Sequence, residues 1–199
     1  MSYAREFATI ELLVSSDAET RGVDAFALSI IKMERQLRRL FTFSIFQYPC
    51  FSDGSIQELK DALAAERIYF EGFIKGFDAI HPKSIADLIG ADYTRLHPVL
   101  AIVTRHRNKI FHGQLTGEDL SRRDLLGHVA ALQDWCRLLG EGARCYMGYE
   151  GFDNSFRKAA DAAFVSGYKL QLSRINDYKK LLKNTLSGKP KSKEQASLP

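Results

Sequence analysis

Arg107, Asn108 and His112 are the residues of this chain whose types and spacing could most readily do chemistry. They form the string Arg-Asn-x-x-x-His, which ends directly before Gly113. An arginine keeps its positive charge, so it can neutralise charge that builds up on a phosphate, whereas a histidine titrates near neutrality and can transfer protons. Held together on one surface, this pair is suited to cutting a phosphodiester bond.

The distance between the arginine and the histidine is weak evidence by itself. With 15 arginines and 5 histidines in 199 residues, one Arg-x-x-x-x-His spacing is expected roughly 0.4 times by chance. Arg123 and His128 repeat that spacing. Requiring an asparagine directly after the arginine lowers the expectation to on the order of 0.01, so Asn108 makes the string informative.

A single amphipathic helix is predicted to carry the string. Apolar residues recur every three or four positions from about residue 92 to 111, and Gly113 can end the helix. Asn108 and His112 are four residues apart and would share a face, with Arg107 at its edge. His112 would lie in the last turn, where its ring can leave the helix axis and meet a substrate.

The rest of the chain has the same helical period, and the sequence predicts an all-α protein. Residues 1–186 are expected to form one domain, with a loop at residues 140–151, where four glycines occur. His128 is predicted to be a partly buried structural histidine in the middle of a helix. The predicted helices cover residues 23–48, 55–63, 68–80, 84–89, 92–112, 121–139 and 154–182.

Composition is that of an ordinary globular protein, with 45% hydrophobic and 26% charged residues. No run approaches about 18 uninterrupted apolar residues, so no membrane span is expected, and the first residues do not resemble a signal peptide. Cys50, Cys136 and Cys145 are an odd number without a C-x-x-C pair, which argues against a disulfide scaffold and a zinc knuckle. No metal or cofactor is expected, and a reducing cytoplasm is the simplest location.

The net charge of +4 comes from the C-terminal end of the chain. Residues 1–175 carry 22 basic and 22 acidic side chains, so any nucleic-acid-binding surface there must be a local patch. Residues 187–199 have the composition of a flexible basic tail. This tail could hold RNA through phosphate contacts, although such a segment more often keeps a protein soluble.

The string resembles the signature of HEPN domains (higher eukaryotes and prokaryotes nucleotide-binding), which carry Arg-x-x-x-x-His late in a long helix of a small all-α protein. The wider string from Arg107 to Gly117, together with the helix that begins near Ser121, is most similar to plasmid and bacterial members. The resemblance covers roughly residues 22 to 170. It implies a bundle of about five to six helices that dimerises with its two motif helices facing each other.

Catalytically active members of this superfamily are metal-independent ribonucleases. The resemblance implies that Arg107 contacts the scissile phosphate, that His112 acts on the 2′-hydroxyl or on the leaving oxygen, and that Asn108 orients one of these groups. The expected partners are RNA and a second copy of the chain, in a toxin or phage-defence role. Toxins of the superfamily that are silenced by nucleotidylation carry a tyrosine two positions after the histidine. Gln114 stands there, so an antitoxin is not implied.

Four further residues are candidates for binding the substrate. Arg105 and His106 could extend a phosphate-binding patch, although a solvated helix face explains them equally well. Glu34 and Arg38 lie four residues apart on the helix predicted for residues 23–48 and share a face, so they are the members of that helix expected to reach a cleft.

Two other functions remain open from the sequence. The first is a HEPN-like module without catalysis that binds RNA, a nucleotide or a protein through the same cleft. The second is a DNA-binding regulator that uses the helix at residues 121–139. This hypothesis is weaker, because that helix is largely apolar.

Overall fold

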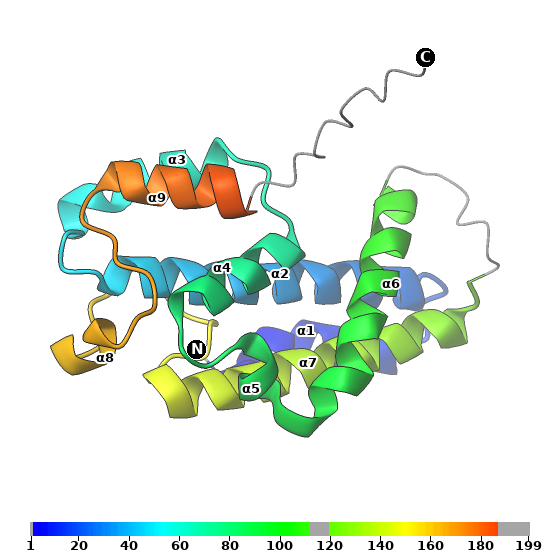
Figure 1. Cartoon of the computed structure of the whole chain (residues 1–199). Helices are drawn as coiled ribbons and strands as arrows, with labels where there is room; N and C mark the ends of the chain where they lie inside the picture. Colours follow the sequence, from blue (N-terminus) through cyan, green and yellow to red (C-terminus); the bar gives the residue numbers. More distant parts are fainter. Residues whose placement is uncertain (1, 112–119, 187–199) are drawn as a thin grey trace, which may run out of the picture.

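We describe residues 2–111 and 120–186 of a computed structural model, in which helices are joined by turns and irregular chain and no strand occurs within these ranges. The all-α prediction is therefore confirmed for these ranges. Figure 1 shows the helices packed around α2 and α7, which lie beside each other over much of their length. The predicted basic tail, 187–199, lies outside the described residues. The α-helices are α1 (Tyr3–Ser15), α2 (Arg21–Gln47), α3 (Ile56–Ala64), α4 (Phe70–Ile80), α5 (Ile85–Ile89), α6 (Tyr93–Phe111), α7 (Arg122–Met147), α8 (Ala162–Ser166) and α9 (Ile175–Leu181).

Short helical turns extend several of these helices. One-turn 3₁₀ segments, Asp53–Ser55 and Gly90–Asp92, precede α3 and α6, and a π-helical turn, Leu182–Leu186, continues α9. Capping boxes form at the starts of α5 and α7: Ser84 pairs with Asp87, and Ser121 pairs with Asp124. Each serine hydroxyl accepts the backbone N–H three residues on, and the aspartate accepts the serine N–H, which satisfies two helix-end donors.

The architecture differs from the predicted bundle of about five to six helices in three places. Helix α1 was not predicted; it packs against α2 and α7 through Phe7 and Ile10, which are buried. Residues 140–147 are the last two turns of α7 rather than a loop, and the helix ends at Gly148 in the left-handed region (φ 68°). Residues 154–182 are not one helix, because irregular chain separates α8 and α9 from each other and from α7.

Glycine allows α7 to pass close to α5, which explains why the helix continues through a glycine-rich stretch. A Cβ atom on Gly142 would lie only 2.0 Å from the carbonyl oxygen of Leu88. A side chain cannot fit at that distance, so the close approach of the two helices requires glycine there. The composition of residues 140–151 therefore reflects helix packing in its first half and a turn only from Gly148 onward.

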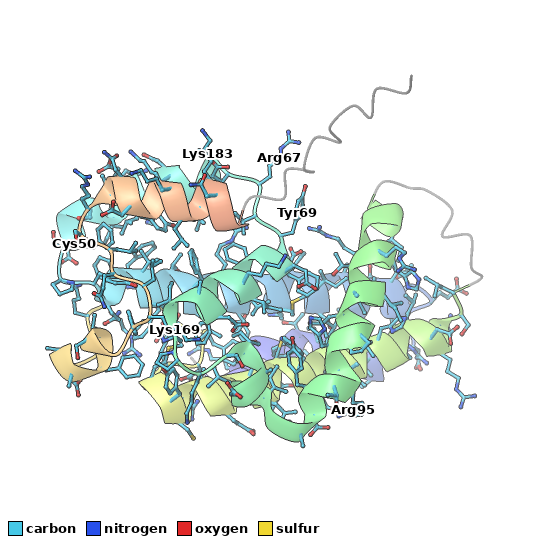
Figure 2. All side chains as sticks on the ribbon, viewed as in Figure 1. Cys50, Arg67, Tyr69, Arg95, Lys169 and Lys183 are labelled. Carbon is cyan, nitrogen blue, oxygen red and sulfur yellow. The ribbon has the colours of Figure 1, made fainter. Side chains whose placement is uncertain are left out.

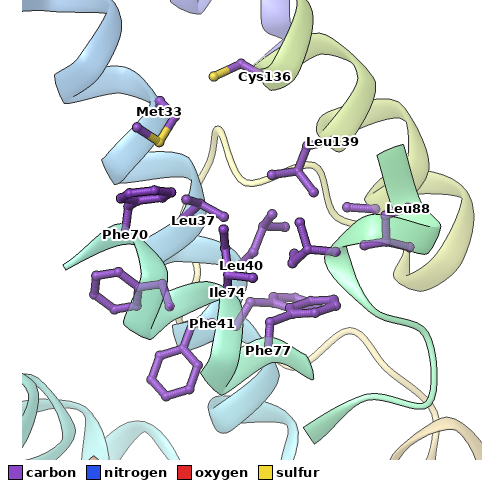
Figure 3. Packing of buried hydrophobic residues seen from close by; sticks show 14 of the residues in the cluster. Met33, Leu37, Leu40, Phe41, Phe70, Ile74, Phe77, Leu88, Cys136 and Leu139 are labelled. Atoms are coloured by element: carbon purple, nitrogen blue, oxygen red, sulfur yellow. The ribbon is translucent and has the colours of Figure 1, made fainter. Parts of the chain in front are cut away.

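The core is centred on α2, whose residues 40–47 are all buried, as is Tyr48 directly after the helix. Figure 3 shows its side chains packed against α4, α5 and α7 in one continuous cluster. Such a helix needs an apolar partner on every side, which explains why α1, α4 and α7 all contact it. The residues labelled in the figure are Met33, Leu37, Leu40, Phe41, Phe70, Ile74, Phe77, Leu88, Cys136 and Leu139.

Two glutamines of α2 attach irregular chain to this core. The amide nitrogen of Gln36 donates to the carbonyls of Cys136 (2.9 Å) and Glu150 (3.0 Å). Gln47 donates to the carbonyl of Arg157 (2.9 Å), and its oxygen accepts the N–H groups of residues 159 and 160. Buried polar groups need partners, and apart from the Cys136 carbonyl, which lies inside α7, the backbone groups that these amides bind belong to irregular chain.

None of the helices within residues 2–111 and 120–186 is long and apolar enough to span a membrane.

His81 is fully buried directly after α4 and is stacked on Phe77, with ring centroids 4.1 Å apart. Its Nε2 atom lies 2.7 Å from the Ser44 hydroxyl, which itself donates to the carbonyl of Leu40. Burial lowers the pKa of His81 from 6.5 to about 3, with a smaller contribution from the positive charge of Lys169. The ring is therefore neutral in the folded protein at every physiological pH.

This burial predicts a specific loss of stability in acid. Below pH 6.5 the unfolded chain takes up a proton at His81 that the folded protein does not, so the free energy of unfolding falls as the pH drops toward about 3. The expected contribution is about 1.4 kcal/mol for each pH unit. Urea denaturation of the wild type and of His81→Gln between neutral pH and pH 4 measures it. The variant should lose stability less steeply, and equal slopes would contradict the account.

Candidate functional site

Helix α6 carries Arg107 and Asn108 of the motif and crosses α2, and Figure 1 shows its C-terminal end projecting past α2 away from the rest of the molecule. Its buried face consists of Leu96, Leu100, Val103 and His106, at spacings of three and four residues. Arg107 is one position beyond that face and is therefore at the edge of the contact with α2. The end of α6 is thus anchored on one side and open on the other.

Arg107 meets Glu34 of α2 across this contact. Its Nη2 atom lies 3.3 Å from the Oε2 atom of Glu34, and the two side chains remain 27% and 24% exposed. Residues 73 positions apart in the sequence are thereby brought together, so the guanidinium of Arg107 contacts a side chain of a second helix. Partial exposure leaves the pair within reach of a ligand.

Of the two other residues of the motif, only Asn108 lies within the described residues. Asn108 lies in α6, one position after Arg107, but its side chain is outside the described part of the chain. His112 lies outside the described residues altogether. The position of Arg107 near the end of α6 agrees with the helical setting that the sequence predicts for the motif.

Arg105 and His106, predicted together as an extension of a phosphate-binding patch, point in different directions. Arg105 is exposed, whereas His106 is only 3% exposed, because residues 103 and 106 share the face of α6 that packs against α7. His106 therefore does not lie on an exposed patch. Its ring is 5.6 Å from the ring of His128 on α7, centroid to centroid.

His106 and His128 line a groove of about 500 Å³ between α6 and α7, together with Arg123 and Asp124. Burial lowers the pKa of His128, the neighbouring His106 lowers it further, and Asp124 acts in the opposite direction. His128 is therefore a neutral, half-buried histidine at neutral pH, in agreement with the structural role that its sequence context suggests. The sequence does not reveal that it faces His106, because their contact depends on how α6 and α7 pack.

Arg38 lies one helical turn from Glu34 on the same side of α2. Its guanidinium carbon is 5.6 Å from the ring centroid of Phe73 in α4, and the side chain lines a pocket between α2, α3 and α4. Of the two residues of α2 that were expected to reach a cleft, Glu34 thus lies beside Arg107 and Arg38 lies in a separate, adjacent hollow.

Among residues 2–111 and 120–186, no group of three or more histidine, cysteine, aspartate or glutamate side chains is placed to hold a metal ion.

Comparison with protein-family models, with curated proteins and with solved structures finds no significant match. The site must therefore be interpreted from its own residues and geometry.

The contact between Arg107 and Glu34 can be tested by a double-mutant cycle. Glu34→Gln, Arg107→Gln and the double variant should give a coupling of about 0.2–1 kcal/mol in the free energy of unfolding, since the pair is partly exposed. The pair Arg137 and Glu141, four residues apart on α7 and 3.3 Å from each other, serves as the matched control. Additive effects at Glu34 and Arg107 would show that the pair does not form in solution.

Proposed function

We propose that this protein is a metal-independent endoribonuclease of the HEPN type and that it acts in the cytoplasm as a homodimer. The single observation that carries the proposal is the placement of Arg107. It stands near the projecting end of α6, in the string Arg107-Asn108-x-x-x-His112, and its side chain remains partly exposed there. The all-helical body and the exposed site agree with the resemblance of the string to HEPN domains.

The proposed reaction needs proton transfer and charge neutralisation. A base removes the proton of the 2′-hydroxyl, and the 2′-oxygen forms a bond to phosphorus while the bond from phosphorus to the 5′-oxygen breaks. The 5′-oxygen takes up a proton, so the products are a 2′,3′-cyclic phosphate and a 5′-hydroxyl. His112 transfers one of these protons, Arg107 neutralises charge on the phosphate, and Asn108 orients a reacting group.

Glu34 acts through Arg107 in this scheme and is a positioning residue. A guanidinium held by a carboxylate loses fewer rotamers when it meets a phosphate than a free arginine side chain does. The carboxylate also offsets part of the positive charge of Arg107. Glu34 should therefore orient the guanidinium at some cost in the affinity of Arg107 for the phosphate.

A second copy of the chain would complete the site. Two large apolar side chains support an interface near the motif helix: Ile102 of α6 is 39% exposed and Ile31 of α2 is 41% exposed. Apolar residues of this kind are commonly buried in the centres of dimer interfaces. In a symmetric dimer built on α6, the two motif ends would face one cleft.

The alternative function is a HEPN-like module that binds RNA, a nucleotide or a protein without cutting it. The contact between Glu34 and Arg107 is the observation that favours it, since a carboxylate 3.3 Å away reduces the charge that Arg107 can offer a transition state. Both functions place the ligand at the same end of α6.

The nuclease proposal is tested by incubating purified protein with single-stranded RNA in EDTA and identifying the ends of the products. Cleavage should leave 2′,3′-cyclic phosphates, and Arg107→Ala or His112→Ala should slow it at least about 100-fold, the size expected for loss of a general acid or base or of a charge-stabilising contact.

Arg95 and His97, which lie earlier in α6, provide matched controls. Arg95 is paired with Asp134 of α7 as Arg107 is with Glu34, and His97 lies 3.5 Å from Glu71. Arg95→Ala and His97→Ala should cleave RNA at the wild-type rate. Cleavage that survives loss of both Arg107 and His112 would refute the nuclease proposal, and RNA binding without cleavage would favour the alternative module.

A further inference from the structure

A concave pocket of about 480 Å³ lies between α2, the end of α3, the start of α4 and the chain at residues 155–156. Its size is within the range of small-molecule and nucleotide sites. We call it the basic pocket, because three cationic side chains and a single carboxylate, that of Glu66, line it. The residues that matter for its chemistry are Arg38, Arg39, Thr42, Lys60, Phe73 and Ser155.

Within residues 2–111 and 120–186, the three cations of the basic pocket contact aromatic rings and backbone rather than carboxylates. Within the described part of the chain, Arg38, Arg39 and Lys60 form no ion pair with a carboxylate. Arginines elsewhere in the molecule do so repeatedly: Arg95 pairs with Asp92, and Arg144 pairs with Glu150, each at 2.8 Å. A cluster of cations without carboxylate partners around a hollow favours an anionic ligand.

Aromatic rings and backbone hold these cations in place. Arg38 lies over Phe73, and the Nζ atom of Lys60 is 5.3 Å from the centre of the Phe156 ring. Arg39 donates to the carbonyl of Phe152 at 2.8 Å, which uses one of its five N–H groups and fixes its guanidinium. Cations that are fixed before binding lose less conformational entropy when they meet an anion.

The floor of the basic pocket is polar as well. The hydroxyls of Thr42 and Ser155 lie 2.9 Å apart, and both residues are buried. Thr42 already donates to the carbonyl of Arg38 at 3.0 Å, so of these two hydroxyls only that of Ser155 can donate to a bound phosphate, whose oxygens accept hydrogen bonds and carry charge.

The basic pocket begins next to the proposed catalytic end of α6. Glu34, which contacts Arg107, and Arg38, which lines the pocket, are four residues apart on α2, and their Cα atoms are therefore separated by about 6 Å along the helix. A strand bound at Arg107 could therefore extend along α2 toward the pocket.

Tyr69 adds a surface of a different kind. It is 53% exposed on the segment between α3 and α4, whose Glu66 and Ile68 line the basic pocket. Figure 2 shows Tyr69 and Arg67 projecting from this segment away from the body. An exposed aromatic ring beside a cationic hollow is the arrangement with which proteins stack one base of a single strand.

We propose that the basic pocket binds a backbone phosphate of the RNA strand that is cut at the end of α6, with a neighbouring base stacked on Tyr69. The inference rests on the proposed function for the identity of the strand. The same phosphate chemistry could be presented by a free mononucleotide, so the experiment compares both sources.

The experiment measures binding of a short single-stranded RNA with 2′-O-methyl riboses, which cannot be cut by 2′-hydroxyl attack. Fluorescence anisotropy at salt concentrations from roughly 50 to 200 mM gives the affinity and its salt dependence. Lys60→Gln and Arg38→Gln should each weaken binding on the order of threefold to tenfold and lower the salt slope by about 0.7, the contribution of one phosphate contact on a single strand.

Two matched controls separate this effect from general changes in charge or folding. Lys83 is also an exposed lysine above an aromatic ring, 5.4 Å from the centre of Tyr146, but it lies before α5 and does not line the pocket. Lys83→Gln should bind RNA as the wild type does. Tyr69→Phe keeps the ring and should bind normally, whereas Tyr69→Ala should lose at least about fivefold in affinity.

Failure of this inference can be told apart from failure of the nuclease proposal. If Arg107→Ala abolishes cleavage while Lys60→Gln and Arg38→Gln leave RNA affinity and KM unchanged, the basic pocket is not a subsite although the nuclease stands. If the wild type does not bind this RNA but cleaves an unmodified one, the basic pocket is not a subsite although the nuclease stands; if it neither binds nor cleaves RNA, both are wrong. If adenosine monophosphate binds and Lys60→Gln weakens only that binding, the pocket takes a free nucleotide and the RNA subsite is refuted.

Discussion

Burial of the second half of α2 is the constraint on which the rest of the structure depends. Every residue from 40 to 48 is buried, so apolar elements must surround the helix and its polar side chains must find partners inside the protein. Ser44 meets His81, and Gln47 binds the backbone of residues 157–160. Chain that forms no helix of its own is thus fixed to the core by the polar groups of α2.

The first half of α2 is exposed on one side, and the proposed functional surface lies there. Glu34 and Arg38 occupy successive turns and contact different elements, Arg107 of α6 and Phe73 of α4. One rigid helix therefore sets the separation between the end of α6 and the basic pocket. A site that draws on α2, α3, α4 and α6 benefits from this rigidity, since catalysis and strand binding need groups held within fractions of an ångström.

The net charge of the chain does not reveal this surface, because the charges are arranged locally. The first 175 residues are neutral, yet Arg38, Arg39 and Lys60 gather around one hollow with a single carboxylate in its lining. At the end of α6, Glu34 instead offsets Arg107. The basic pocket is thus suited to holding a strand, whereas the end of α6 is suited to orienting a reacting group.

Sequence reasoning succeeded where local signals are strong. The period of α6 and the ends of the helices predicted for residues 68–80 and 84–89 all follow from residues close together in the chain. It failed where tertiary contacts decide: Gly142 looks like a loop residue until its contact with Leu88 is known, and His106 looks exposed until α6 is packed on α7. The basic pocket could not be predicted, because its cations come from α2 and α3 and its floor from Ser155.

The central claim is that the end of α6 is half of a catalytic site and that a second chain completes it. Mixing two inactive variants, Arg107→Ala and His112→Ala, under conditions that allow subunits to exchange tests this claim most directly. If Arg107 of one chain works with His112 of the other, each mixed dimer holds one intact site, and an equal mixture should regain about a quarter of wild-type RNA cleavage. A mixture as inactive as either variant alone would contradict the account.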